Sequence, residues 1–324
     1  MLVMDKPSGE RPLLDDAAPL LTDLLRNLKM RNYHFITPTP ATHARVLARR
    51  RHERARSLRD IFGWSMRFAP SLLDPGLLCA LEQAGLIVQE GDALISRVRV
   101  SSLGDDLFLH SAYPTSGQDA VFFGPDSYRF ARLIEEELAR CPQRRSARLV
   151  DIGTGAGVGG IVAAKACPFA NIILTDINPA ALHLARVNAA GAGVEASFHQ
   201  AGDLAALDGA FDVALANPPY IVDGEGRAYR DGGGMHGGAV SIDMAGQAVP
   251  RLAPGGRFIL YTGSAIVDGR DALRERLADL AHRQDCTLRY SEIDPDVFGE
   301  ELETPAYEHV ERIALVAAII VRGA

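Results

Sequence analysis

The stretch Leu149-Val-Asp-Ile-Gly-Thr-Gly-Ala-Gly157 places a short apolar strand directly before a glycine-rich turn, and a helical pattern follows it to Cys167. Glycines at such a turn let the backbone approach a ligand closely, and the start of the helix offers unpaired N–H groups. Gly155, Gly157 and Gly160 also satisfy the dinucleotide fingerprint GxGxxG. The stretch by itself therefore leaves a nicotinamide cofactor open as an alternative.

Strands and helices alternate on both sides of this turn. Apolar runs predict strands at 149–151, 171–176, 194–199, 211–216, 257–261, 287–292 and 313–321. Helical patterns occupy 128–140, 157–167, 179–188, 240–252 and 269–283. Alternation of this kind predicts an α/β protein with a doubly wound, Rossmann-like sheet. Ligands of such sheets bind at the carboxyl ends of the strands.

Polar residues follow three of these strands at that edge. The second strand ends at Asp176, where a carboxylate can accept hydrogen bonds from both hydroxyls of a ribose. Asn178 before Pro179 is a typical helix cap and first-turn pair. Asp203, shortly after the third strand, can read the adenine amino group or can be an ordinary loop residue.

The tetrad Asn217-Pro218-Pro219-Tyr220 follows the fourth strand. The first proline restricts the backbone, so that the Asn217 side-chain oxygen and the Pro218 carbonyl can both accept hydrogen bonds from one NH2 group. We expect Tyr220 to stack on the planar group that carries this nitrogen. An amide or nucleobase nitrogen is a poor nucleophile, and two fixed acceptors orient it and favour the charge that develops on it.

The chain resembles the class I S-adenosylmethionine-dependent methyltransferases, in the amino-methylating branch that includes release-factor glutamine, guanine-N2 ribosomal RNA and adenine-N6 enzymes. The resemblance rests on the glycine turn after Asp151, on Asp176 and on the Asn217 tetrad, in this order. It implies a seven-stranded sheet whose last strand is antiparallel, and S-adenosylmethionine as cofactor. We assign the cofactor contacts to Asp151, Gly153, Gly155, Gly157, Asp176, Ile177, Asp203 and Asn217, and the target contacts to Asn217, Pro218, Pro219 and Tyr220.

Two segments are expected beside the pocket. Phe122-Phe-Gly-Pro-Asp-Ser127 precedes the helix that leads into the sheet, where release-factor enzymes carry a proline-rich segment; only a proline, an acid and a hydroxyl correspond here. The glycine-rich insert at 223–238 can order over a substrate or be a flexible connection. We interpret His236 within it as a bystander.

The residues before about 116 have a different pattern. Helices are expected at 13–33, from the Thr37-Pro-Thr-Pro40 tetrad onward, at 57–62 and at 75–84, followed by a small antiparallel sheet from 86–88, 93–100 and 106–110. Helices followed by such a wing suggest a winged-helix-like module. We therefore divide the chain into a helical, winged-helix-like substrate-recognition domain at 1–115 and a methyltransferase domain at 116–324.

Composition limits the remaining possibilities. The chain has 324 residues, 47% of them hydrophobic and 23% charged, which is the balance of a globular protein. The longest apolar run is too short to span a bilayer, and we expect a cytoplasmic protein with no membrane partner. Four scattered cysteines without a CxxC pair suggest neither a metal site nor a disulfide framework.

The net charge is −7, yet seven arginines fall between Arg45 and Arg59. Such a run can contact phosphates or can be a solvated helix face. The favoured function is methyl transfer from S-adenosylmethionine to a planar amide or exocyclic amine nitrogen of RNA or protein, with RNA slightly preferred. The alternatives are a nicotinamide oxidoreductase and a non-catalytic nucleic-acid-binding protein.

Overall fold

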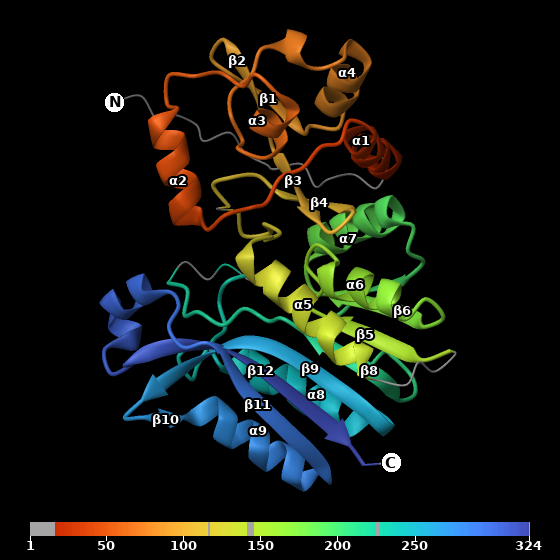
Figure 1. The fold of residues 1–324 in the computed structure, drawn as a ribbon, viewed down its shortest axis with the longest axis vertical. Coiled ribbons are helices and arrows are strands. Elements are labelled where there is room, and N and C mark those ends of the chain that lie inside the picture. Colours follow the sequence, from red (N-terminus) through yellow and green to blue (C-terminus); the bar gives the residue numbers. More distant parts are fainter. Residues whose placement is uncertain (1–16, 116, 141–145, 225–226, 228, 324) are drawn as a thin grey trace, which may run out of the picture.

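The structure, a computed structural model, describes residues 17–115, 117–140, 146–224, 227 and 229–323. A large sheet occupies one half of the molecule, and residues 17–111 form the other half (Figure 1). The sheet has the order β11-β12-β9-β8-β5-β6-β7, with the short β10 paired to β9. Its strands are β5 (Arg148–Ile152), β6 (Asn171–Asp176), β7 (Ser197–Gln200), β8 (Phe211–Ala216), β9 (Leu252–Val267), β10 (Arg270–Asp271), β11 (Cys286–Asp294) and β12 (Arg312–Arg322).

The long strands β5 to β9 pair in parallel, whereas β12 runs antiparallel to both of its neighbours. This confirms the doubly wound sheet and its antiparallel last strand. The helices of this half are α5 (Pro125–Ala139), α6 (Val158–Ala166), α7 (Pro179–Ala192), α8 (Ala239–Ala248) and α9 (Ala272–Arg283). The bounds differ from the expected ones by a few residues, most of all for β9, whose pairing with β12 extends it at its carboxyl end.

Helices cover both faces of the sheet because successive strand residues point to opposite sides. Leu149 packs in one hydrophobic core with residues of α5, α6 and α7, and its neighbour Val150 packs in a second core with residues of α8 and α9. The near-continuous apolar composition of β5 and β8 follows from burial on both faces.

The amino-terminal module, residues 17–111, contains α1 (Ala18–Met30), α2 (Pro40–Arg49), α3 (Leu58–Phe62), α4 (Pro75–Gln83) and four strands. Residues 13–16 of the expected first helix lie outside the described residues. The starts of α2 and α3 agree with the expectation because Thr39 and Ser57 cap them through their hydroxyl oxygens.

The prediction of one small antiparallel sheet in this module is wrong. The strands form two separate hairpins, β1 (Ile87–Glu90) with β2 (Ala93–Ser96) and β3 (Val98–Leu103) with β4 (Asp106–Ser111). The single strand expected at 93–100 is interrupted at Arg97. There the Ser96 hydroxyl donates a hydrogen bond to the Val98 carbonyl, and the Arg97 N–H donates one to the Leu86 carbonyl. The chain thereby leaves the first hairpin before it enters the second.

The module docks on the sheet half through α7. Asn188 of α7 is fully buried and accepts a hydrogen bond from the Leu109 N–H of β4 at 2.7 Å. Its amide also donates to the Leu109 carbonyl at 2.9 Å and to the Ala156 carbonyl in the glycine turn at 2.8 Å. One side chain therefore joins the amino-terminal module to the turn that follows β5.

Candidate active site

The glycine turn between β5 and α6 is held by the side chain of Asp151. Its Oδ2 accepts hydrogen bonds from the Thr154 hydroxyl at 2.5 Å and from the Gly160 N–H at 2.8 Å. Burial raises the pKa of this carboxyl group to about 6, against the two hydrogen bonds, which lower it. Gly153 and Gly155 have φ values of +66° and +55°, a region that favours glycine.

Asp176 closes the same turn from the neighbouring strand. Its Oδ2 accepts the Gly155 N–H at 2.9 Å, and its Oδ1 accepts the Asn178 N–H at 2.9 Å. Burial raises its pKa. Each oxygen keeps a lone pair beyond these contacts, so the carboxylate can accept two further hydrogen bonds from a ligand. Asn178 caps α7 as expected, through the Ala180 N–H.

A cavity of about 380 Å³ opens at the carboxyl edge of the parallel strands. Its wall includes seven of the residues that the sequence singled out: Asp151, Gly153, Gly155, Asp176, Ile177, Asn217 and Pro219. Phe122 and Ser127 also line it, in agreement with the expectation for the segment before α5. Asn217 and Pro219 of the tetrad therefore meet the residues of the glycine turn at one site, whereas Pro218 and Tyr220 lie outside this wall.

The tetrad forms a corner at this cavity. Asn217 is partly exposed there, and its amide makes no hydrogen bond to any described protein group. Tyr220 is buried: its hydroxyl donates to Asp126 at 2.6 Å, and its ring packs edge-on against Phe298 with the centroids 5.8 Å apart. The hydroxyl of Tyr261 donates to the other oxygen of Asp126 at 2.9 Å.

Tyr220 therefore does not present its ring to the cavity, contrary to the stacking role expected for it. Burial, and after it the neighbouring Asp126, raises the pKa of the Tyr220 hydroxyl well above its usual value. This hydroxyl stays protonated and serves as a fixed donor. Asp126, the acid of the segment expected beside the pocket, thus anchors the corner from the start of α5.

The insert after the tetrad packs against the corner with almost no space. A Cβ on Gly237 would lie 2.2 Å from the Tyr220 carbonyl oxygen, and one on Gly232 would lie 2.7 Å from the Tyr220 Cα. The Gly232 N–H donates to the Ile221 carbonyl, which joins the insert to the chain leaving the tetrad. Of this insert, residues 225, 226 and 228 lie outside the described residues.

Comparisons with known proteins agree with this geometry. A family model described as "Methyltransferase small domain" matches residues 131–281. The release factor glutamine methyltransferase of Deinococcus radiodurans is 32% identical over 217 residues, which cover 64% of this chain and 73% of that protein. A relative from Koribacter versatilis, described in the same words, is 32% identical over 42% of this chain, and the match spans only 53% of its own length.

The chain belongs to the class I S-adenosylmethionine-dependent methyltransferases, in the branch that carries Asn-Pro-Pro-Tyr. It is thus an enzyme that uses S-adenosylmethionine, and the nicotinamide alternative is set aside. Among solved structures, a T. thermophilus 16S rRNA N2 G1207 methyltransferase in complex with AdoMet and guanosine is 16% identical. The structural alignment covers 77% of this chain and 62% of that protein's chain, with a TM-score of 0.44.

The residues of the methyltransferase cavity fit this cofactor in their charge and in the open space beside the glycine turn. S-adenosylmethionine carries a sulfonium and an ammonium group, and four carboxylates line the cavity: Asp151, Asp176, Asp231 and Asp243. A Cβ on Gly155 would meet no protein atom within 4 Å, so the backbone there is open to a ligand. Ile177 exposes 59% of its surface at the rim, which suits contact with a flat adenine ring.

Two of the residues assigned to the cofactor lie outside this wall. Asp203 is exposed and accepts the Ala205 N–H at 2.9 Å, while Gly202 beside it lines the cavity. The structure thus does not bring Asp203 to the site. Gly157, with φ +84°, caps α6 and packs against Ile161 and Ala185.

The methyltransferase cavity also has a wall that sequence reasoning missed, formed by Val240, Asp243 and Met244 of α8. Tyr229, within the insert that was expected beside the pocket, lines it as well. The ring of Tyr229 lies nearly parallel to that of Phe122, with the centroids 6.3 Å apart, and its hydroxyl donates to the Thr115 carbonyl at 2.7 Å. An aromatic residue within a glycine-rich segment was the only available signal.

In the part of the chain that the structure describes, no group of three or more His, Cys, Asp or Glu side chains is arranged to hold a metal ion. Within the same residues, no helix is both long enough and apolar enough for a membrane span. Cys141, one of the four cysteines, lies outside the described residues.

Proposed function

We propose that this methyltransferase transfers a methyl group to the NH2 nitrogen of a planar amide or nucleobase amine on a macromolecule. The observation that carries the proposal is the partly exposed Asn217 amide at the cavity that Asp151 and Asp176 border. In this proposal the side-chain oxygen of Asn217 and the Pro218 carbonyl accept hydrogen bonds from the two N–H groups of the target. S-adenosylmethionine, when bound, supplies an electrophilic methyl group.

The chemistry needs orientation more than a strong base. The lone pair of an amide or exocyclic amine nitrogen is delocalised, so two fixed acceptors must turn it toward the donor and favour the positive charge that develops on it. Methylation makes the nitrogen acidic, and its proton can then leave to solvent. The buried hydrogen bonds of Tyr220 and Tyr261 to Asp126 support this role because they fix the backbone of the corner.

We further propose that Phe122 and Tyr229 take the stacking role first given to Tyr220. Both rings line the cavity, and they lie within 7° of parallel. A nucleobase gains about 1–3 kcal/mol from stacking on an aromatic side chain. The cofactor roles proposed for Gly153, Gly155 and Ile177 rest on their places in the same wall.

The test is transfer of tritium from methyl-labelled S-adenosylmethionine into cell extract by the purified full chain. Nuclease and protease digestions in parallel identify the kind of macromolecule, and hydrolysis identifies the methylated atom. The proposal expects label on nitrogen, and its loss with Asn217→Ala. Label on oxygen, carbon or sulfur, or full transfer by Asn217→Ala, would overturn it.

A further inference from the structure

Charge divides this chain into two unlike parts. Residues 17–111 carry 13 Lys and Arg against 9 Asp and Glu, whereas residues 112–324 carry 19 against 28; the first 16 residues add 2 against 4. The amino-terminal module is thus at +4 and the catalytic part at −9. The negative net charge of the catalytic part would repel a polyanion, so electrostatic attraction of a polyanion must come from the amino-terminal module.

The positive charge of the module is concentrated in one stretch of the chain, from α2 to α3. We call it the α2 basic face; it consists of Arg45, Arg49, Arg51, Arg56 and Arg59, all exposed. None of the five has a carboxylate partner within 4.0 Å among the described residues, whereas Arg50 pairs with Glu53 and Asp60, and Arg54 pairs with Asp92. The neighbouring acids are thus already used by other arginines.

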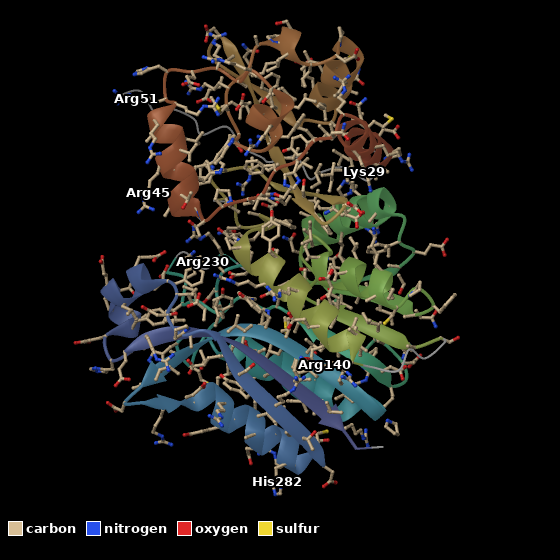
Figure 2. All side chains as sticks on the ribbon, in the orientation of Figure 1. Lys29, Arg45, Arg51, Arg140, Arg230 and His282 are labelled. Carbon is tan, nitrogen blue, oxygen red and sulfur yellow. The ribbon has the colours of Figure 1, made fainter. Side chains whose placement is uncertain are left out.

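The arrangement on α2 suits an extended partner. Arg45 and Arg49 are one helical turn apart and share an outward face, while His43 points inward and is fully buried. Figure 2 shows Arg45 on α2 and Arg51 just beyond the end of this helix, both at the outer edge of the molecule. A helix of ten residues spans about 15 Å, the axial rise of roughly four nucleotides along one strand of a duplex.

Two short chains of contacts lead from α2 to the active site. Just before the helix, the Thr37 N–H donates to the Tyr128 hydroxyl at 3.0 Å, and Tyr128 lies on α5 close to Asp126. His43 stacks on Tyr113 with the ring centroids 4.2 Å apart. Tyr113 is two residues from Thr115, whose carbonyl accepts the hydroxyl of the cavity residue Tyr229.

We propose that the α2 basic face binds the phosphates of an RNA strand whose target base enters the cavity, so that RNA is the substrate of this enzyme. The inference rests on the proposed function, because it needs a base amine at the Asn217 corner. Guanidinium groups suit phosphates because they form paired, charge-assisted hydrogen bonds. Exposed arginines without a carboxylate partner among the described residues match the repeated charges of a polyanion, which an acidic protein segment rarely provides.

The test measures binding of a fluorescein-labelled single-stranded oligoribonucleotide of mixed sequence to the full chain by fluorescence anisotropy. The variant combines Arg45→Gln, Arg49→Gln and Arg56→Gln. The matched control combines Arg186→Gln, Arg274→Gln and Arg276→Gln, which are exposed arginines of α7 and α9 that likewise lack a carboxylate partner among the described residues. The variant and the control each lack three positive charges, so the two proteins have the same net charge.

The variant is expected to bind the oligoribonucleotide at least about tenfold more weakly at low salt, and the plot of log affinity against log salt should become shallower by about 2. The control should bind as the wild type does. Equal binding by the variant and the wild type, an equal loss in the control, or displacement of the RNA by polyglutamate at equal charge would overturn the proposal.

Failure here and failure of the proposed function can be told apart. Calorimetry with S-adenosylhomocysteine reports the cofactor cavity alone and should give one affinity for all three proteins. Label transferred to protein nitrogen, with RNA untouched, would overturn the RNA proposal and keep the N-methylation. RNA binding that needs the α2 basic face, with methyl label in RNA on carbon or oxygen, would keep the surface and overturn the proposed chemistry.

Discussion

Replacing Asn188 by Ala should weaken both folding and cofactor binding, because this fully buried amide makes hydrogen bonds to two segments. The change removes three hydrogen bonds, each worth about 0.5–1.5 kcal/mol net, and leaves the Leu109 N–H and two carbonyl groups without partners. The free energy of unfolding should fall by about 2–5 kcal/mol. Loss of the bond to the Ala156 carbonyl alone should lower cofactor affinity by roughly three- to tenfold.

The assay compares urea unfolding with calorimetry of S-adenosylhomocysteine below the melting range of every protein. Leu25→Ala is the matched control: Leu25 is buried on α1 and packs against Gly191 of α7, and its truncation should cost about 2–5 kcal/mol at the same interface. It does not touch the glycine turn, so its cofactor affinity should equal that of the wild type. Unchanged affinity in Asn188→Ala, or the same loss in Leu25→Ala, would refute the reasoning.

Three further predictions concern the site. The pKa of Asp151 rises from 3.8 to about 6 on folding, so the folded state holds the carboxyl proton more tightly. The protonated carboxyl group therefore stabilises the fold fully at low pH, and this contribution is lost as the pH rises through about 6. Asp151→Asn should flatten that part of the pH dependence of the free energy of unfolding, measured in urea. Gly237→Ala places a Cβ 2.2 Å from the Tyr220 carbonyl oxygen, at a residue with φ +93°. The substitution should lower the free energy of unfolding by about 1–3 kcal/mol, measured by thermal unfolding, and abolish methyl transfer. Transfer at the wild-type rate would contradict this. In Asp126→Asn, the amide offers one oxygen in place of two to the hydroxyls of Tyr220 and Tyr261. Methyl transfer should therefore fall at least about tenfold while cofactor affinity stays the same. An equal loss of methyl transfer and cofactor affinity would instead indicate unfolding.

The parts of the fold that sequence reasoning found are those encoded locally. Apolar runs gave the strands of the sheet, and Thr39, Ser57 and Asn178 marked helix starts because their side chains cap the N–H groups that follow. The glycine turn and Asp176 were found for the same reason: strand, turn and acid lie close together in the chain. The hairpins of the module were missed because one hydroxyl, that of Ser96, interrupts an otherwise continuous strand pattern.

The site was predicted less completely where contacts join distant residues. Tyr220 is buried because Asp126, 94 residues earlier, accepts its hydroxyl, and no local pattern contains that pairing. Asp203 was assigned by its place after a strand, but the loop beyond β7 turns Gly202 to the cavity and leaves the acid in solvent. The α8 residues Asp243 and Met244 reach the wall only through packing of that helix on the sheet.

The central claim is that Asn217, assigned from the sequence to both cofactor and target, acts on the target nitrogen and contributes little to the fold or to cofactor affinity. Asn217→Ala should bind S-adenosylhomocysteine within about threefold of the wild type by calorimetry, a difference below 1 kcal/mol, while transfer of labelled methyl groups falls by at least about a hundredfold. Loss of cofactor binding with transfer retained at saturating cofactor would contradict the account.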